Sequence, residues 1–124
     1  MGRSGPPRRR RLTRSGDFDR VFRDGRSHAN RYLVVYAFPR GDEADAGPRL
    51  GISVGRKVGD ATERNTVKRA LREAFWALAE EEEERDVVIV ARPDAAGLVE
   101  RGGTPALTEQ LRPLLDDFAR ERST

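Results

Sequence analysis

The sequence predicts a single α/β domain, and three of its segments carry that prediction. Aliphatic and aromatic side chains alternate from Tyr32 to Phe38, a period of two that indicates a strand. Apolar residues recur at helical spacing from Thr62 to Leu78, and Asp86–Ala91 is a short apolar run typical of a covered strand. With a further strand at 49–54, these segments form a strand, helix, strand crossover, which is right-handed in most proteins. A chain of 124 residues can bury one modest core.

The chain is expected to divide into a flexible basic arm, residues 1–11, and a single α/β domain, residues 12–124. The arm contains Gly, Pro and Arg with a single apolar residue, a composition that cannot build a packed structure alone. Beyond it, Ser15 or Asp17 can cap a short helix that ends at Gly25. One face of this helix carries Phe18, Val21 and Phe22.

The segment from Arg26 to Phe38 is expected to form a short strand and then a longer one. The aliphatic face of the longer strand suits packing against helices. Its other face carries Tyr32, Val34, Tyr36 and Phe38. We interpret that face as a partly open platform for unpaired nucleobases, with ordinary packing of a two-sided strand as the alternative.

The helix predicted at 62–78 combines a core face with a basic face, and Thr62 is expected to cap it. The core stripe consists of Val67, Ala70, Leu71, Ala74, Phe75 and Leu78. The basic sector beside it consists of Arg64, Asn65, Lys68, Arg69 and Arg72. Cations in the first turns of a helix oppose its macrodipole, so an anion bound across them would explain the pattern. A charged face that is merely solvated is the alternative.

Two further elements flank this helix. The preceding turn places Arg56 and Lys57 between two glycines and is a candidate phosphate cradle, although the spacings of nucleotide-binding fingerprints are absent. Near the C-terminus, Thr104 is expected to cap a helix begun by Pro105 and kinked at Pro113.

Basic charge is concentrated in two blocks of the chain. Residues 1–26 contain nine Arg against three Asp, and residues 49–72 contain seven basic against two acidic side chains, whereas residues 73–124 contain thirteen acidic against six basic. This segregation is expected of a protein that presents one face to a polyanion. The preference for Arg over Lys is explained by codon bias, but the segregation is not.

Other functional classes find little support. The chain has no cysteine and only one histidine, His28, and no Ser, His and acid set or metal-ligand cluster has a recognisable spacing. No apolar run is long enough for a membrane span or a signal peptide, so we expect a cytoplasmic protein with no membrane partner.

The chain resembles the protein subunit of bacterial ribonuclease P from Leu12 to about Arg92. The matching segments, in order, are LTRSGDFDRVFRDG, ANRYLVVY, RLGISVGRKVG and RNTVKRALREAF, and the R-N-x-x-K-R-x-x-R motif is the most specific of them. The resemblance implies an α/β (α+β) sandwich of the ribosomal-protein-domain-2-like kind, with element order α-β-β-β-α-β-α. It also implies a small mixed sheet and a left-handed βαβ crossover.

The resemblance further implies a division of labour in a ribonucleoprotein endonuclease. The RNA subunit, with bound Mg²⁺, would remove the 5′ leader of precursor tRNA, while one monomeric copy of this RNA-binding domain would assist it. Residues carried over to the RNA-subunit-binding surface are Arg56, Lys57, Arg64, Asn65, Lys68, Arg69 and Arg72. Residues carried over to the leader-binding cleft are Arg14, Phe18, Phe22, Val34 and Tyr36.

Two residues depart from the family's pattern, since Thr66 stands where many relatives have arginine and Asp60 where asparagine is common. Each removes positive charge from the expected RNA surface. The alternative function is a ribosome-associated RNA-binding structural protein, which would show the same basic helix. A stand-alone metal-dependent nuclease would need an acidic cluster on the basic side, and the sequence shows none.

Overall fold

The structure is a computed structural model that describes residues 10–12, 15–39, 48–79 and 85–123. Its elements are β1 (Arg10–Arg11), α1 (Ser15–Asp24), β2 (Arg26–Ala29), β3 (Leu33–Pro39), β4 (Arg49–Val54), α2 (Ala61–Leu78), β5 (Arg85–Ala91) and α3 (Ala95–Ser123). Apart from the two-residue β1, this is the predicted order. Residues 1–9 of the predicted basic arm lie outside the described residues, whereas Arg10–Arg11 pair in parallel with the start of β4.

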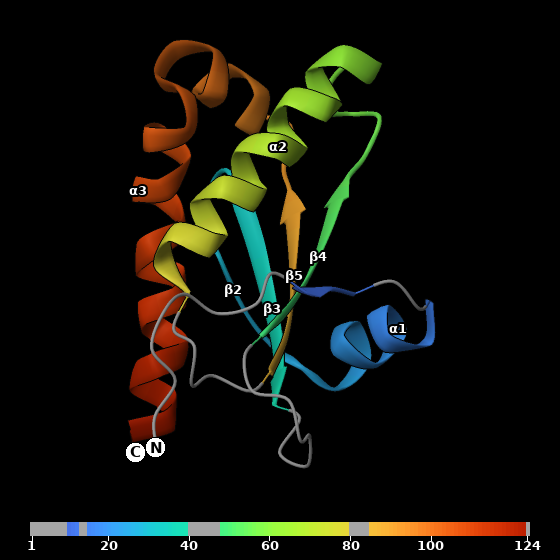
Figure 1. Cartoon of the computed structure of the whole chain (residues 1–124), viewed down its shortest axis with the longest axis vertical. Coiled ribbons are helices and arrows are strands. Elements are labelled where there is room, and N and C mark those ends of the chain that lie inside the picture. The colour runs from blue at the N-terminus through green and yellow to red at the C-terminus, as the bar shows by residue number, and fades with distance from the viewer. Residues whose placement is uncertain (1–9, 13–14, 40–47, 80–84, 124) are drawn as a thin grey trace.

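The strands form one mixed sheet in the order β1-β4-β5-β3-β2. β4 and β5 are parallel, and β3 is antiparallel to both of its neighbours. In Figure 1 the chain runs up β4, returns down α2 in front of the sheet, and runs up β5 to the left of β4. The crossover is therefore left-handed, as the resemblance implies, and the general expectation of a right-handed connection is wrong for this protein.

The main core lies between the sheet and the pair α2 and α3, which cover the same face (Figure 1). The alternation predicted for β3 is confirmed, because Leu33, Val35 and Ala37 are each at most 4% exposed. The predicted stripe of α2 is buried except at Leu78, which is partly buried. Sequence reasoning missed Trp76, which is also buried although it flanks the stripe.

The start of α2 differs from the prediction, because Asp60 rather than Thr62 is the capping residue. Oδ1 of Asp60 accepts a hydrogen bond from the backbone N–H of Glu63 at 2.8 Å, and Oε1 of Glu63 accepts one from the N–H of Asp60 at 2.9 Å. This reciprocal capping box satisfies two donors at once, which Thr62 could not do from inside the first turn.

The C-terminal helix α3 begins earlier than predicted and bends elsewhere. Its first part starts at Ala95, and the break lies at Gly103, where φ is 67° and ψ is −163°. Glycine adopts this left-handed geometry without the steric cost of a Cβ. The second part begins near Thr104 and Pro105 as predicted, but its backbone stays helical at Pro113, so the kink expected there is wrong.

Helix α1 packs on the opposite face of the sheet and forms a second, smaller core. Leu12, Val21 and Val88 are buried in it, surrounded by the partly buried Phe18, Tyr36, Phe38 and Val90. α1 can approach the sheet closely because two glycines lie at the contacts. A Cβ on Gly25 would come within 2.4 Å of the carbonyl oxygen of Val21 and 2.8 Å of that of Ala37, and one on Gly51 would come within 2.5 Å of the Phe18 ring.

An ionic cluster also ties α1 to the sheet. Asp86 of β5 is fully buried, and Arg49 of β4 donates to both of its carboxylate oxygens, at 2.7 and 2.8 Å. Arg20 of α1 donates to Asp86 and to Asp17, each at 3.4 Å. The guanidinium of Arg20 also lies over the ring of Phe38, 5.1 Å from its centre. A buried carboxylate needs such partners, because removing one from a buried pair costs roughly 3–5 kcal/mol.

We predict that Gly25→Ala lowers the free energy of unfolding by about 1–3 kcal/mol, the usual cost of overpacking, because two backbone carbonyls stand where the methyl group would lie. Gly16→Ala in the same helix is the control, since nothing lies within 4 Å of its added Cβ. Urea unfolding should separate the two variants. Equal stability of the two would contradict the close packing of α1 on β3.

Candidate nucleic-acid interface

An aromatic cluster lies where the C-terminal half of α1 meets β3. The rings of Phe18 and Phe22 are 6.5 Å apart, and Phe22 meets Tyr36 edge-on at 4.9 Å. Phe22 is 40% exposed, and it is the one large hydrophobic residue of the described chain whose side chain is exposed. Three of the predicted leader-binding residues are thus brought together, whereas Arg14 lies outside the described residues.

Beyond this cluster the same face of the sheet is left open. Val34 lies two residues from Tyr36 along β3 and pairs with Val90 of β5, and both valines are only partly buried. Ala29 of β2, opposite Val34, is exposed, and Ser53 of β4, opposite Val90, is partly exposed. The fourth predicted leader residue, Val34, therefore belongs to a shallow apolar floor that adjoins the aromatic cluster. Such a floor beside aromatic rings suits the stacking of unpaired bases.

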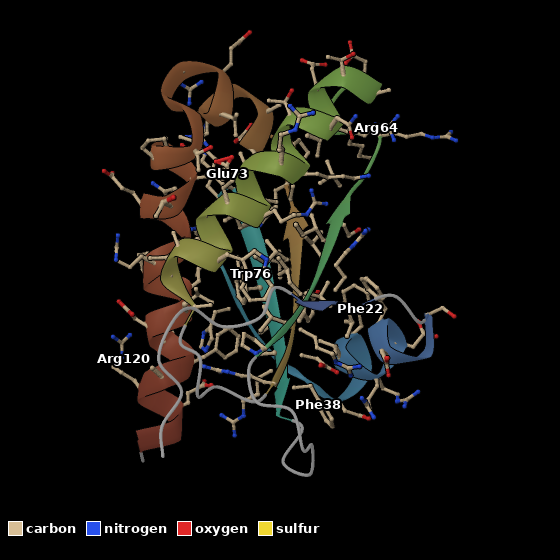
Figure 2. All side chains as sticks on the ribbon, in the orientation of Figure 1. Phe22, Phe38, Arg64, Glu73, Trp76 and Arg120 are labelled. Atoms are coloured by element: carbon tan, nitrogen blue, oxygen red, sulfur yellow. The ribbon has the colours of Figure 1, made fainter. Side chains whose placement is uncertain are left out.

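The basic sector lies on α2. Asn65, Arg69 and Arg72 are exposed, and Arg64 and Lys68 are partly buried. Figure 2 shows Arg64 on the side of α2 away from α3, whereas Glu73 lies on the side next to α3. Within the described part of the chain, no carboxylate forms an ion pair with the cations of this sector. The Nε atom of Arg64 is moreover buried without a hydrogen-bond partner, an arrangement that is uncommon in folded proteins.

Other arginines of the described chain are engaged in structural ion pairs. Arg49 and Arg20 bind the buried Asp86, and Arg26 pairs with Glu121 at 3.5 Å. Arg31 donates a hydrogen bond to Asp94 at 2.7 Å, which raises the pKa of Arg31 above its ordinary value. The protein thus separates cations that hold the fold from cations left available to an external anion.

The turn before α2 is only partly suited to its predicted role as a phosphate cradle. Arg56 and Lys57 are both exposed, and the N–H of Val58 donates to the carbonyl of Gly55 at 3.1 Å to close the turn. However, the capping box already uses the N–H groups of Asp60 and Glu63. The two basic side chains, rather than the helix start, are the groups available to a phosphate.

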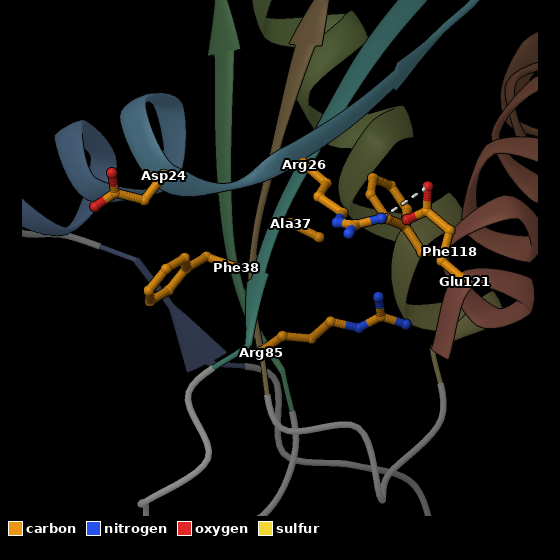
Figure 3. A pocket seen from close by; sticks show the side chains of 7 residues that line it. All are labelled: Asp24, Arg26, Ala37, Phe38, Arg85, Phe118 and Glu121. Atoms are coloured by element: carbon orange, nitrogen blue, oxygen red, sulfur yellow. Dashed lines mark ion pairs between the residues drawn. The ribbon is translucent and has the colours of Figure 1, made fainter. Parts of the chain in front are cut away.

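A separate hollow of about 340 Å³ lies at the end of the sheet where β3 ends and β5 begins (Figure 3). Arg26 lies at this hollow and is paired with Glu121, and the guanidinium of Arg85 lies over the ring of Phe118, 5.6 Å from its centre. Close by, Nε2 of His28 is 3.0 Å from Oε2 of Glu121. These contacts attach the end of α3 to the sheet, so His28 has a structural role.

The described residues contain no group of three or more His, Cys, Asp or Glu side chains that could hold a metal ion. No helix among them is both long and apolar enough to cross a membrane.

Comparison with known proteins gives one consistent result. A sequence model of the family described as ribonuclease P matches residues 7–118. The ribonuclease P protein component of Streptococcus pyogenes serotype M49 is 42% identical over 88 residues, which is 71% of each chain. The RNase P protein of Staphylococcus aureus superposes with a TM-score of 0.75 at 33% identity, covering 88% of this chain and 94% of that one. That of Thermotoga maritima superposes with a TM-score of 0.71 at 34% identity, covering 85% and 94%.

The match spans the aromatic cluster and the left-handed crossover, of which the basic helix α2 is part. It extends over most of the chain in both sequence and structure. The chain belongs to the ribonuclease P protein family, and its role is in the processing of tRNA 5′ ends.

Proposed function

We propose that this chain binds the RNA subunit of ribonuclease P through the basic sector and receives the 5′ leader of precursor tRNA on the aromatic cluster and its valine floor. The observation that carries the proposal is the separation of the arginines into two sets. Those that anchor α1 to the sheet are paired, whereas Arg64, Lys68, Arg69 and Arg72 form no ion pair within the described chain. Phosphate contacts supply most of the affinity of proteins for nucleic acid, so unpaired cations on one rigid helix suit a structured RNA.

The chemical step is assigned to the RNA subunit, in keeping with the resemblance stated above. Mg²⁺ held mainly by that RNA would activate the attacking water and stabilise the leaving oxygen. The protein's residues would then contribute binding and orientation of the substrate, which lower the barrier without a protein acid or base. One copy of the chain per RNA, acting in the cytoplasm, completes the proposal.

Reconstitution tests the function directly. Added to a bacterial ribonuclease P RNA at low Mg²⁺, the protein should stimulate removal of the 5′ leader from precursor tRNA, and without that RNA it should cleave nothing. The measurement is the rate of appearance of mature 5′ ends. RNA binding without any stimulation would favour a structural RNA-binding role, and cleavage by the protein alone would place the chemistry in this chain.

The basic sector is tested by a double variant with a matched control. Arg64→Ala with Arg69→Ala should weaken binding of the RNA subunit. It should also reduce the slope of log K against log salt by about 1.8, because each of the two lost phosphate contacts contributes about 0.9 if the value for duplex DNA applies. Arg101→Ala with Arg112→Ala removes the same charge from exposed positions of α3 that form no ion pair with a described residue. Identical salt slopes for the two double variants would mean that the sector is only solvated.

The aromatic cluster is tested with two substrates. Tyr36→Ala should weaken binding of precursor tRNA by roughly 1–3 kcal/mol, the range for one base stack, and leave mature tRNA binding unchanged. Phe38→Ala is the control, because Phe38 lies on the same face of β3 but under Arg20 and α1. Phe38→Ala should lower the melting temperature of the protein and should change the affinities for precursor and mature tRNA equally. If Tyr36→Ala weakened both tRNAs equally, Tyr36 would belong to the core and not to a leader site.

A further inference from the structure

A cavity of about 250 Å³ lies at the edge of β4, at the point where the short β1 stops. Its apolar wall includes Phe18 of α1, Ile52 of β4 and Trp76 of α2. Figure 2 shows Trp76 on the last turns of α2, beside the sheet. The cavity is smaller than the roughly 300–1,000 Å³ of pockets that enclose drug-sized ligands, so it suits a single planar ring system.

The back of this cavity is an unpaired strand edge. The N–H of Leu12, the residue after β1, donates to the carbonyl of Leu50 at 2.9 Å, and among the described residues of this segment it is the last to bond to β4. In a strand, residues two apart direct their backbone groups to the same side, so the N–H and C=O of Ile52 also face this edge. No described residue pairs with them there. A donor and an acceptor side by side complement the edges of nucleobases, which carry the same two kinds of group.

The rim of the cavity is cationic. Arg11, Lys68 and Arg72 line it, and none of them forms an ion pair with a described carboxylate. An open strand edge can also bind an extended peptide, but three uncompensated cations around an apolar pocket favour a polyanion. Two of the three belong to the basic sector of α2, so the cavity is continuous with the surface assigned to the RNA subunit.

We propose that this cavity takes one unpaired nucleobase of the RNA subunit. The ring enters between Phe18 and Trp76, its edge bonds to the backbone of Ile52, and the flanking phosphates meet Arg11, Lys68 and Arg72. The proposal rests on the proposed function and adds a base-recognition site to a surface otherwise described by phosphate contacts. Single-stranded RNA is commonly recognised by this combination of stacking, edge hydrogen bonds and backbone charge.

The chain contains one tryptophan, so the tryptophan fluorescence comes from Trp76, which lines this cavity. An RNA hexamer should reduce that emission saturably, after correction for absorbance. An abasic RNA of six sugar–phosphate units should bind through its phosphates and leave the Trp76 emission unchanged. Equal effects of the two hexamers, or a bound RNA hexamer that leaves the emission unchanged, would overturn the proposal.

Variants locate the effect. Lys68→Ala with Arg72→Ala should lower the affinity for the RNA hexamer, measured by the change in Trp76 emission. The expected loss is about fivefold per lost phosphate contact near 0.1 M salt, because the salt slope for single strands is about 0.7 per contact. Arg101→Ala with Arg112→Ala should retain the wild-type affinity for this change in emission, because neither residue lines the cavity. Circular dichroism verifies that each variant is folded. If the Lys68 and Arg72 variant kept wild-type affinity, the site would be elsewhere.

The source of the base is decided by comparing two natural RNAs. The RNA subunit alone should reduce Trp76 emission at a lower concentration than precursor tRNA alone. A reduction by precursor tRNA only would overturn the assignment to the RNA subunit. If the RNA subunit bound and leader cleavage was stimulated without any change in Trp76 emission, the cavity proposal would fail while the proposed function stood. If both binding and stimulation were absent, both would fail.

Discussion

The relative positions of the helices and strands in this protein depend on the ion pairs of the buried Asp86 carboxylate. It is fully buried, and it is bound by two hydrogen bonds from Arg49 and one from Arg20. A charge in such a place is tolerated only with its partners, so β4, β5 and α1 are held in one relative position. With α1 fixed there, one half of the sheet face is covered and the half around Val34 and Val90 stays open. The candidate leader surface is thus a consequence of where an ion cluster anchors a helix.

The composition of the RNA surface follows from the same division between paired and unpaired charge. Arginine serves both purposes here, because its planar guanidinium can bind a carboxylate at two points and can equally face phosphate. Asp86 and Asp17 bind the arginines of the second core, while Arg64 lies on the side of α2 away from α3 (Figure 2). Unpaired cations that lie close together repel one another, and bound RNA would remove that cost. The basic sector is therefore better explained by its partner than by the stability of the helix.

The two residues that the resemblance singles out as departures from the family's pattern, Asp60 and Thr66, both make hydrogen bonds at the start of α2. Asp60 caps α2 through its carboxylate, and asparagine is an equally good capping residue, so the substitution preserves the helix start while it adds one negative charge near Arg56 and Lys57. The hydroxyl of Thr66 donates to the carbonyl of Thr62 at 3.0 Å, within the helix, where an arginine would extend outward. Positive charge at the start of α2 is lower for both reasons, whereas Lys68 and Arg72 lie further along the helix and line the cavity at the edge of β4.

The sequence by itself determined the elements and their faces. Alternation along β3, the stripe of α2 and the basic sector beside it are patterns with periods of 2 and 3.6 residues, which local geometry alone dictates. The tertiary structure decided what depends on distant residues. Examples are the bond from Arg49 to Asp86, 37 residues apart, the left-handed crossover, and the coverage of Phe18 and Phe38 but not Phe22. It also decided that β1 ends before Ile52, which opens a cavity beside α2. No local pattern records these outcomes, because each is set by which surfaces meet when the chain folds, and a periodicity specifies only that a face is apolar or charged.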